Sequence, residues 1–189
     1  MELFRKLRVR AGSSILSGKL ARIKRKPHYT NFYHIKTICL VWDASNPEDF
    51  IVLTRFQQKM AEINKEVKIF GYYPENGFPS QYTAIRYLTC LKKKEVNFFC
   101  FPVNPESESF INTKFDVLID INFKKQFPLI YITSMSQAGL KVGLTWAKPL
   151  TSPFDVMISM KSPVDIGKYL EHVLYYLEMI NSETAKKAV

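Results

Sequence analysis

Cysteine, histidine and glycine are scarce in this 189-residue sequence, and each scarcity excludes a class of protein. The three cysteines, at positions 39, 90 and 100, are odd in number and far apart, which argues against a disulfide framework and favours a reducing compartment. Neither they nor the three scattered histidines have the spacing of a zinc site, so we expect no metal. The seven glycines form neither a dinucleotide fingerprint nor a phosphate-binding loop, and we expect no cofactor. We assign no catalytic residue.

Long apolar runs are also lacking. No segment approaches the roughly 20 apolar residues that a helix needs to cross a bilayer, so we expect no transmembrane segment. The basic start of the chain has no continuous apolar core, which argues against a secretory signal, and we expect a cytoplasmic protein. The composition, 47% hydrophobic and 14% aromatic, is that of a folded chain rather than a disordered one.

Positive charge is present, but it is unevenly placed. Residues 1–26 hold nine basic residues and one acid, a net charge of +8, which leaves 18 basic and 16 acidic residues, a net +2, for the rest of the chain. We therefore predict a basic amphipathic N-terminal arm over residues 1–34, a folded domain over residues 35–181 and a polar C-terminal tail over residues 182–189. The arm has apolar residues at helical spacing, interrupted by glycines, which predicts one weakened helix or two short ones ended by Pro27.

The domain alternates strand and helix patterns. Residues 37–42 are a short apolar run typical of a strand buried on both faces, residues 50–63 have one apolar helical face, and residues 67–73 are a second strand. Further strands are predicted over residues 82–91, 115–121, 140–144 and 154–158, with helices over 105–113, 127–138 and 163–180. Ser162 is the expected cap of the last helix. This pattern predicts a single Rossmann-like α/β domain with a mainly parallel sheet and helices on both faces.

Polar side chains follow two of the predicted strands. Asp43 and Asp120 end the first and fourth strands, and Asn46 and Asn122 lie just beyond them. Ligands of open α/β sheets bind at the carboxyl ends of strands, so these four residues are candidates to line a crevice for a small ligand or substrate. The alternative is that both acids bind nearby backbone amides and have a structural role.

The arm is the feature whose chemistry is most visible. Its basic residues suit contact with phosphates of RNA or a nucleoprotein, and Tyr29, Phe32 and Tyr33 are placed to stack on bases. The same arm suits an anionic membrane surface, with Leu3, Phe4, Leu7, Ile15 and Leu16 immersed, or it packs its apolar face on its own domain. The candidate contact residues are Arg5, Lys6, Arg8, Arg10, Lys19, Arg22, Lys24, Arg25 and Lys26.

Four segments also carry a family resemblance: residues 92–99 (KKKEVNFF), 115–120 (FDVLID), 127–132 (FPLIYI) and 138–143 (AGLKVG). With them, residues 35–180 resemble a family of small bacterial proteins of unknown function, which implies a Rossmann-like fold and no known reaction. A fainter similarity, carried by the strand that ends in an acid and by Lys141-Val142-Gly143, runs to the first domain of heptosyltransferase-like glycosyltransferases. It implies the fold more than the function.

The leading hypothesis is thus a non-enzymatic intracellular binding or scaffolding protein whose arm contacts RNA or a nucleoprotein. Two alternatives stay open. One is a small-ligand binder or enzyme that uses the crevice, and the other is a peripheral membrane protein.

Overall fold

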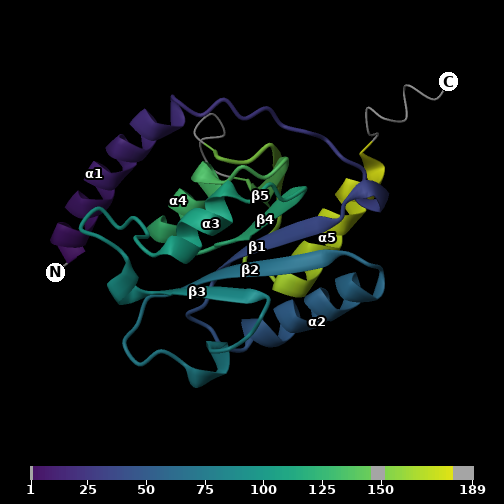
Figure 1. Ribbon diagram of the computed structural model, residues 1–189, viewed down its shortest axis with the longest axis horizontal. Coiled ribbons are helices and arrows are strands. Elements are labelled where there is room, and N and C mark those ends of the chain that lie inside the picture. The colour runs from purple at the N-terminus through teal and green to yellow at the C-terminus, as the bar shows by residue number, and fades with distance from the viewer. Residues whose placement is uncertain (1, 146–151, 181–189) are drawn as a thin grey trace.

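The core of the molecule is one open, six-stranded parallel sheet (Figure 1). The computed structural model describes residues 2–145 and 152–180. The strands are β1 (Thr37–Asp43), β2 (Glu66–Tyr73), β3 (Leu88–Lys92), β4 (Val117–Ile121), β5 (Leu140–Leu144) and β6 (Val156–Ile158). They lie in the order β3-β2-β1-β4-β5-β6, which is the strand order of the dinucleotide-binding Rossmann fold.

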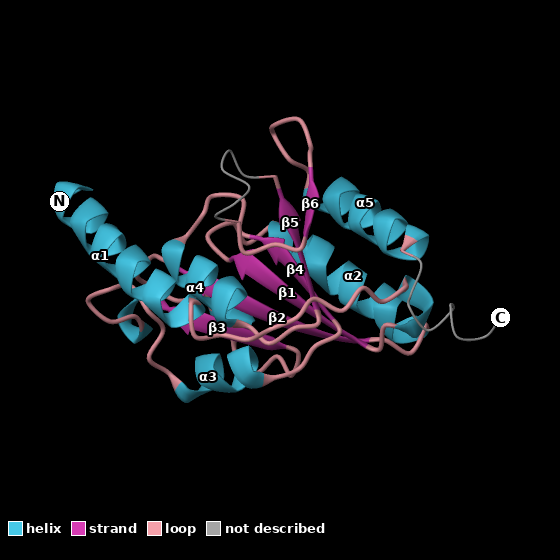
Figure 2. Ribbon diagram, turned by 90° about the horizontal axis from the view of Figure 1, so that it is seen from above, coloured by secondary structure: helices cyan, strands magenta, loops and turns pink. Residues whose placement is uncertain are grey.

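Helices cover both faces of the sheet (Figure 2). The helices are α1 (Glu2–Leu20), α2 (Asp49–Glu62), α3 (Pro105–Asn112), α4 (Phe127–Met135) and α5 (Ile166–Met179). Helices α2 and α5 pack on one face, α3 and α4 on the other, and α1 lies outside α4. The predicted Rossmann-like α/β fold is therefore confirmed.

The central strand shows why the sheet is buried on both sides. In β1, Leu40 and Trp42 join the core under α2 and α5, whereas Cys39 and Val41 join the core under α3 and α4. A run in which every residue is apolar serves both faces at once, as parallel sheets require.

Two predicted boundaries differ from the structure. The strand predicted from residue 82 begins at Leu88, because Tyr82 turns into the core against Trp42 and Ala84 has a positive φ of 59°. The last helix begins at Ile166, where the Asp165 side chain accepts a hydrogen bond from the backbone N–H of Lys168 at 2.7 Å. Asp165, rather than Ser162, is therefore the cap.

The arm forms one helix followed by an extended segment. Helix α1 is continuous through Gly12 and Gly18 and ends at Leu20, well before the predicted stop at Pro27. The chain then runs across the molecule to the 3₁₀ turn at Phe32–His34, which contacts α5 (Figure 1). The predicted tail from residue 182 lies outside the described residues.

Candidate functional site

The structure places the four crevice candidates at the carboxyl edge of the sheet. Val41 pairs with Asp120 and Trp42 with Ile121, so the next residue, Asp43, lies beside Asn122. Strands β1 and β4 are also the pair at which the strand order reverses, the position where ligands of such sheets bind. Asn46 lies farther out, exposed on the loop after β1.

Asp43 is buried, and its carboxylate accepts hydrogen bonds from the loops that follow β1 and β4. Its Oδ1 accepts the backbone N–H of Ser45 at 3.1 Å, and its Oδ2 lies 3.5 Å from the side-chain nitrogen of Gln126. Ser45 is also reached from the other loop, because Lys124 donates to its hydroxyl at 3.0 Å. These contacts join the loop after β1 to the loop after β4. The side-chain amide of Asn46 donates to the carboxylate of Asp49, the first residue of α2, at 2.8 Å.

Asp120 and Asn122 order the second loop. Asp120 accepts hydrogen bonds from the Asn122 backbone N–H, at 2.9 Å, and from the Thr133 hydroxyl on α4. The Asn122 side chain donates to the Gln126 carbonyl and accepts the Gln126 N–H. Burial raises the pKa of Asp120 to about 6, against the opposing effect of its hydrogen bonds. This bonding supports the structural role, and a ligand at these four residues stays a prediction.

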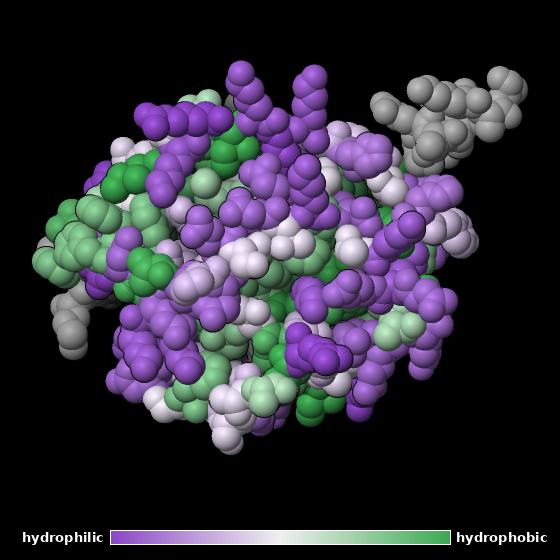
Figure 3. Space-filling model, in the orientation of Figure 1, coloured by the Kyte–Doolittle hydropathy of each residue, from purple (hydrophilic) through white to green (hydrophobic). Residues whose placement is uncertain are grey.

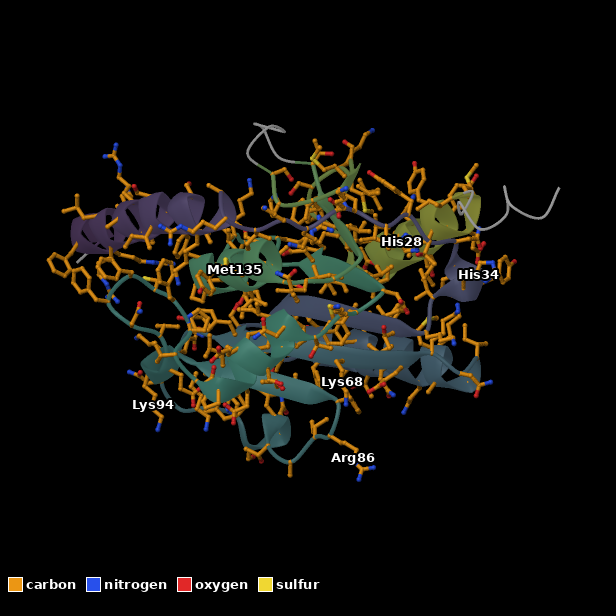
Figure 4. The ribbon with its side chains drawn as sticks, turned by 45° about the horizontal axis from the view of Figure 1, so that its top comes forward. His28, His34, Lys68, Arg86, Lys94 and Met135 are labelled. Carbon is orange, nitrogen blue, oxygen red and sulfur yellow. The ribbon has the colours of Figure 1, made fainter. Side chains whose placement is uncertain are left out.

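Helix α1 packs along α4 (Figure 4). Packing of the arm on its own domain was one of the alternatives drawn from the sequence. Leu16 is buried in a cluster with Phe127 and Tyr131 of α4. Gly12 makes the close approach possible, because a Cβ there would lie 2.5 Å from the Phe99 carbonyl oxygen and 2.9 Å from the Phe127 ring. The sequence signal was the glycine inside a helical pattern, which predicted weakness rather than contact.

Three arm cations also hold the arm to the body. Arg25 forms an ion pair with Asp155 at 2.5 Å and donates to two main-chain carbonyls, those of residues 138 and 139. Arg8 donates to the Phe98 carbonyl at 2.6 Å, and Lys19 to the Tyr131 hydroxyl at 3.2 Å. These contacts fix the backbone of the arm without covering most of its charge.

Seven of the nine candidate cations have exposed side chains: Arg5, Lys6, Arg10, Lys19, Arg22, Lys24 and Lys26. Figure 3 shows hydrophilic side chains projecting above the segment that follows α1, and hydrophobic side chains around the N-terminal half of α1. The exposed apolar residues there include Phe4 and Leu7, which are 60% and 55% exposed. The side chain of Leu3 lies outside the described residues.

One predicted base-stacking residue is buried. Phe32 is in the core cluster, with the Lys65 ammonium 4.4 Å from its ring centroid, so stacking of Phe32 on a base is excluded. Lys65 is itself buried, and it donates to the carbonyls of Phe32 and Ile35. Tyr29 and Tyr33 remain exposed.

Sequence reasoning missed a buried lysine beneath the arm. Lys141 of β5 donates to the Ser134 carbonyl at 2.8 Å and lies near the Arg25–Asp155 ion pair. Burial, and after it the Arg25 guanidinium, lowers the pKa of Lys141 to about 7 against the opposing effect of Asp155. From the sequence, Lys141 was singled out only as part of a segment that carries a family resemblance.

A family model matches residues 8–180, which is most of the chain and includes the greater part of α1. The chain belongs to the family of unknown function DUF6913. The resemblance to a family of unknown function is thus confirmed, and the matched region includes the arm from Arg8 onward.

The other comparisons add little to this DUF6913 assignment. Among solved structures, the chain is similar to E. coli heptosyltransferase WaaC with ADP, at a TM-score of 0.40 and 15% identity. The similarity covers 76% of this chain and 45% of the heptosyltransferase, in keeping with the faint likeness expected from the sequence. A search of curated proteins found no match. Among the described residues, no helix is both long and apolar enough to cross a membrane.

Proposed function

We propose that this DUF6913 protein is a non-enzymatic binding protein whose arm contacts an anionic macromolecule, with RNA or a nucleoprotein favoured. The observation that carries the proposal is the set of seven exposed cations within residues 5–26, on a backbone held to the body by Arg25 and Leu16. Cations on an ordered backbone bind phosphates with less loss of conformational freedom than those of a flexible tail do.

The segment after α1 favours RNA over a membrane. Arg22, Lys24 and Lys26 are exposed, whereas the apolar Ile23 between them is half-buried. A segment that inserts into a membrane would need exposed apolar side chains beside these cations. Contact with a phosphate backbone needs the cations alone.

The test compares two triple variants of the full chain by fluorescence anisotropy with a single-stranded RNA. One variant carries Arg22→Gln, Lys24→Gln and Lys26→Gln. The control carries Arg86→Gln, Lys93→Gln and Lys94→Gln, which removes the same charge from exposed positions. Figure 4 shows Arg86 and Lys94 far from the segment that follows α1.

Each phosphate contact contributes about 0.7 to the slope of log affinity against log salt for a single strand. The arm variant should therefore lower that slope by about 2 and weaken binding about tenfold or more, while the control leaves both close to wild type. Equal effects of the two variants would overturn the proposal. If the protein floated with anionic vesicles and did not bind RNA, the anionic partner of the arm would be a membrane surface instead of RNA.

A further inference from the structure

A groove of about 830 Å³ runs between α1 and α4. Its floor is apolar, since Leu16 and Leu20 line it from α1 and Phe127 and Ile130 line it from α4. Pro153, just before β6, closes one side. The floor lies between the two helices, where Leu16 is only 5% exposed and Leu20 and Ile130 are half-buried.

Cations are gathered at one end of this groove. The two helices run in the same direction, since Gly12 contacts Phe127 and Lys19 contacts Tyr131 further along. Arg5, Lys6 and Arg10 of α1 therefore lie beyond the N-terminus of α4, where Lys125 also lines the groove.

The opposite end, lined by Ser17, Leu20 and Ser134, is uncharged, and it lies about the length of an acyl chain from the cations. Leu20 is ten residues after Arg10, which places it about 15 Å farther along the helix. None of the described residues that line the groove carries a carboxylate. The positive end of the α4 dipole adds to the field of the cations.

We infer that this groove binds a single-chain lipid phosphate, with its phosphate at the cationic end and its acyl chain between α1 and α4. Arginine side chains form charge-assisted hydrogen bonds to phosphate, and the chain removes the apolar floor from water. This ligand complements both halves of the groove. The inference goes beyond the proposed function and does not depend on it.

The shape of the groove argues against larger anionic partners. A nucleic acid would place phosphates and sugars against Leu16, Leu20 and Ile130, which offer them no hydrogen bonds, and the hydroxyls of Ser13 and Ser17 that also line the groove already donate to main-chain carbonyls of α1. A flat bilayer cannot reach a floor that is recessed between two helices. A single detached chain can.

The ligand test uses dodecyl phosphate below its micelle concentration, titrated into the full chain by calorimetry. Inorganic phosphate supplies the head group without the chain, and dodecyl maltoside supplies the chain with a neutral head. We expect dodecyl phosphate to bind at least tenfold more tightly than either. Equal affinity for inorganic phosphate, or for the maltoside, would show that the groove does not bind both the phosphate and the alkyl chain. Either result would overturn the inference.

The variant test separates the two halves of the groove. Ile130→Glu places a carboxylate in the apolar half and should weaken dodecyl phosphate binding at least tenfold. Ile51→Glu makes the same change at an exposed position of α2 and should leave binding unchanged. If Ile130→Glu fails to fold, Ile130→Gln, checked by circular dichroism, takes its place with the same direction of effect.

At the cationic end, Arg10→Gln should weaken binding several-fold, whereas Arg22→Gln, outside the groove, should not. Wild-type affinity in both Arg10→Gln and the position-130 variant would overturn the groove as the site. Because Arg22, Lys24 and Lys26 do not line the groove, the triple arm variant used for RNA should keep its lipid affinity. Failure of the RNA proposal is thereby distinguished from failure of this one.

Discussion

The two glycines of α1 offer a matched test of how the arm is attached. Substituting alanine at either position makes the same chemical change in the same helix. At Gly18 the added Cβ has no atom within 4 Å, whereas at Gly12 it would lie 2.5 Å from the Phe99 carbonyl oxygen. The difference between the variants therefore reports the contact of α1 with the segment around Phe99.

The expected magnitudes follow from two opposing effects. Alanine is better than glycine inside a helix by about 1 kcal/mol, and this gain applies to both variants. A carbon and an oxygen approach to about 3.3 Å without repulsion, so Gly12→Ala must move α1 or Phe99 by several tenths of an ångström. Such overpacking costs about 1–3 kcal/mol. We expect Gly18→Ala to stabilise α1 by up to about 1 kcal/mol and Gly12→Ala to be neutral or to destabilise it by up to about 2 kcal/mol.

Hydrogen exchange of the α1 amides is the most direct assay, because it reports opening of the arm separately from global unfolding. Urea denaturation of both variants supplies the global free energy of unfolding. If Gly12→Ala raised the protection of the α1 amides as much as Gly18→Ala does, α1 would not pack against Phe99. The position of α1 beside α4, and the groove between them, would then be wrong as well.

Three further predictions concern buried charges, each measured by urea denaturation. The pKa of Lys141 is lower in the folded protein than in the unfolded chain, so the wild type should gain stability relative to Lys141→Met as the pH rises from about 7 towards 10. The pKa of Asp120 is raised to about 6, so the wild type should lose stability as the pH rises from about 4 to 6, and Asp120→Asn should remove that slope. A slope that persists in either variant would assign the titration to another group. Arg25→Gln leaves the carboxylate of Asp155 poorly paired and should cost about 2–4 kcal/mol, less when Asp155→Asn is also present, and additive losses would contradict the ion pair.

Local patterns in the sequence were enough to predict the sheet. The apolar run of β1 and the one-sided helix that follows it define a parallel unit whatever the rest of the chain does. Asp43 and Asp120 were placed at strand ends for the same reason. Their bonds to the nearby amides of Ser45 and Asn122 match the structural alternative that the sequence offered. The contact of Asp43 with Gln126 could not be predicted, because the two residues are 83 positions apart and no short-range pattern links them.

The position of α1 is the feature of the fold that could least be predicted from the sequence. Its apolar residues form two stripes rather than one, since Leu16 is buried against α4 while Phe4 and Leu7 on the same helix are exposed. A helix with two apolar stripes has no single buried face that periodicity can detect. Which stripe packs was decided by Gly12, where the absence of a side chain admits the Phe99 segment.

The arm and the carboxyl edge of the sheet, treated separately in the sequence, are neighbours in the structure. Burial is the main cause of the raised pKa of Tyr72, and the charges of both regions act on the same hydroxyl: Asp43 raises this pKa, and Arg5 and Arg8 lower it. Lys125 lines the cationic end of the groove, and the next residue, Gln126, contacts Asp43. An anion bound at that end would therefore lie against the loop that orders the switch point between β1 and β4. The loop after β1 is acidic and has no glycine, unlike the glycine-rich turn of dinucleotide-binding proteins, and the cations nearest to it in the described chain include Lys124 and Lys125 of the loop after β4.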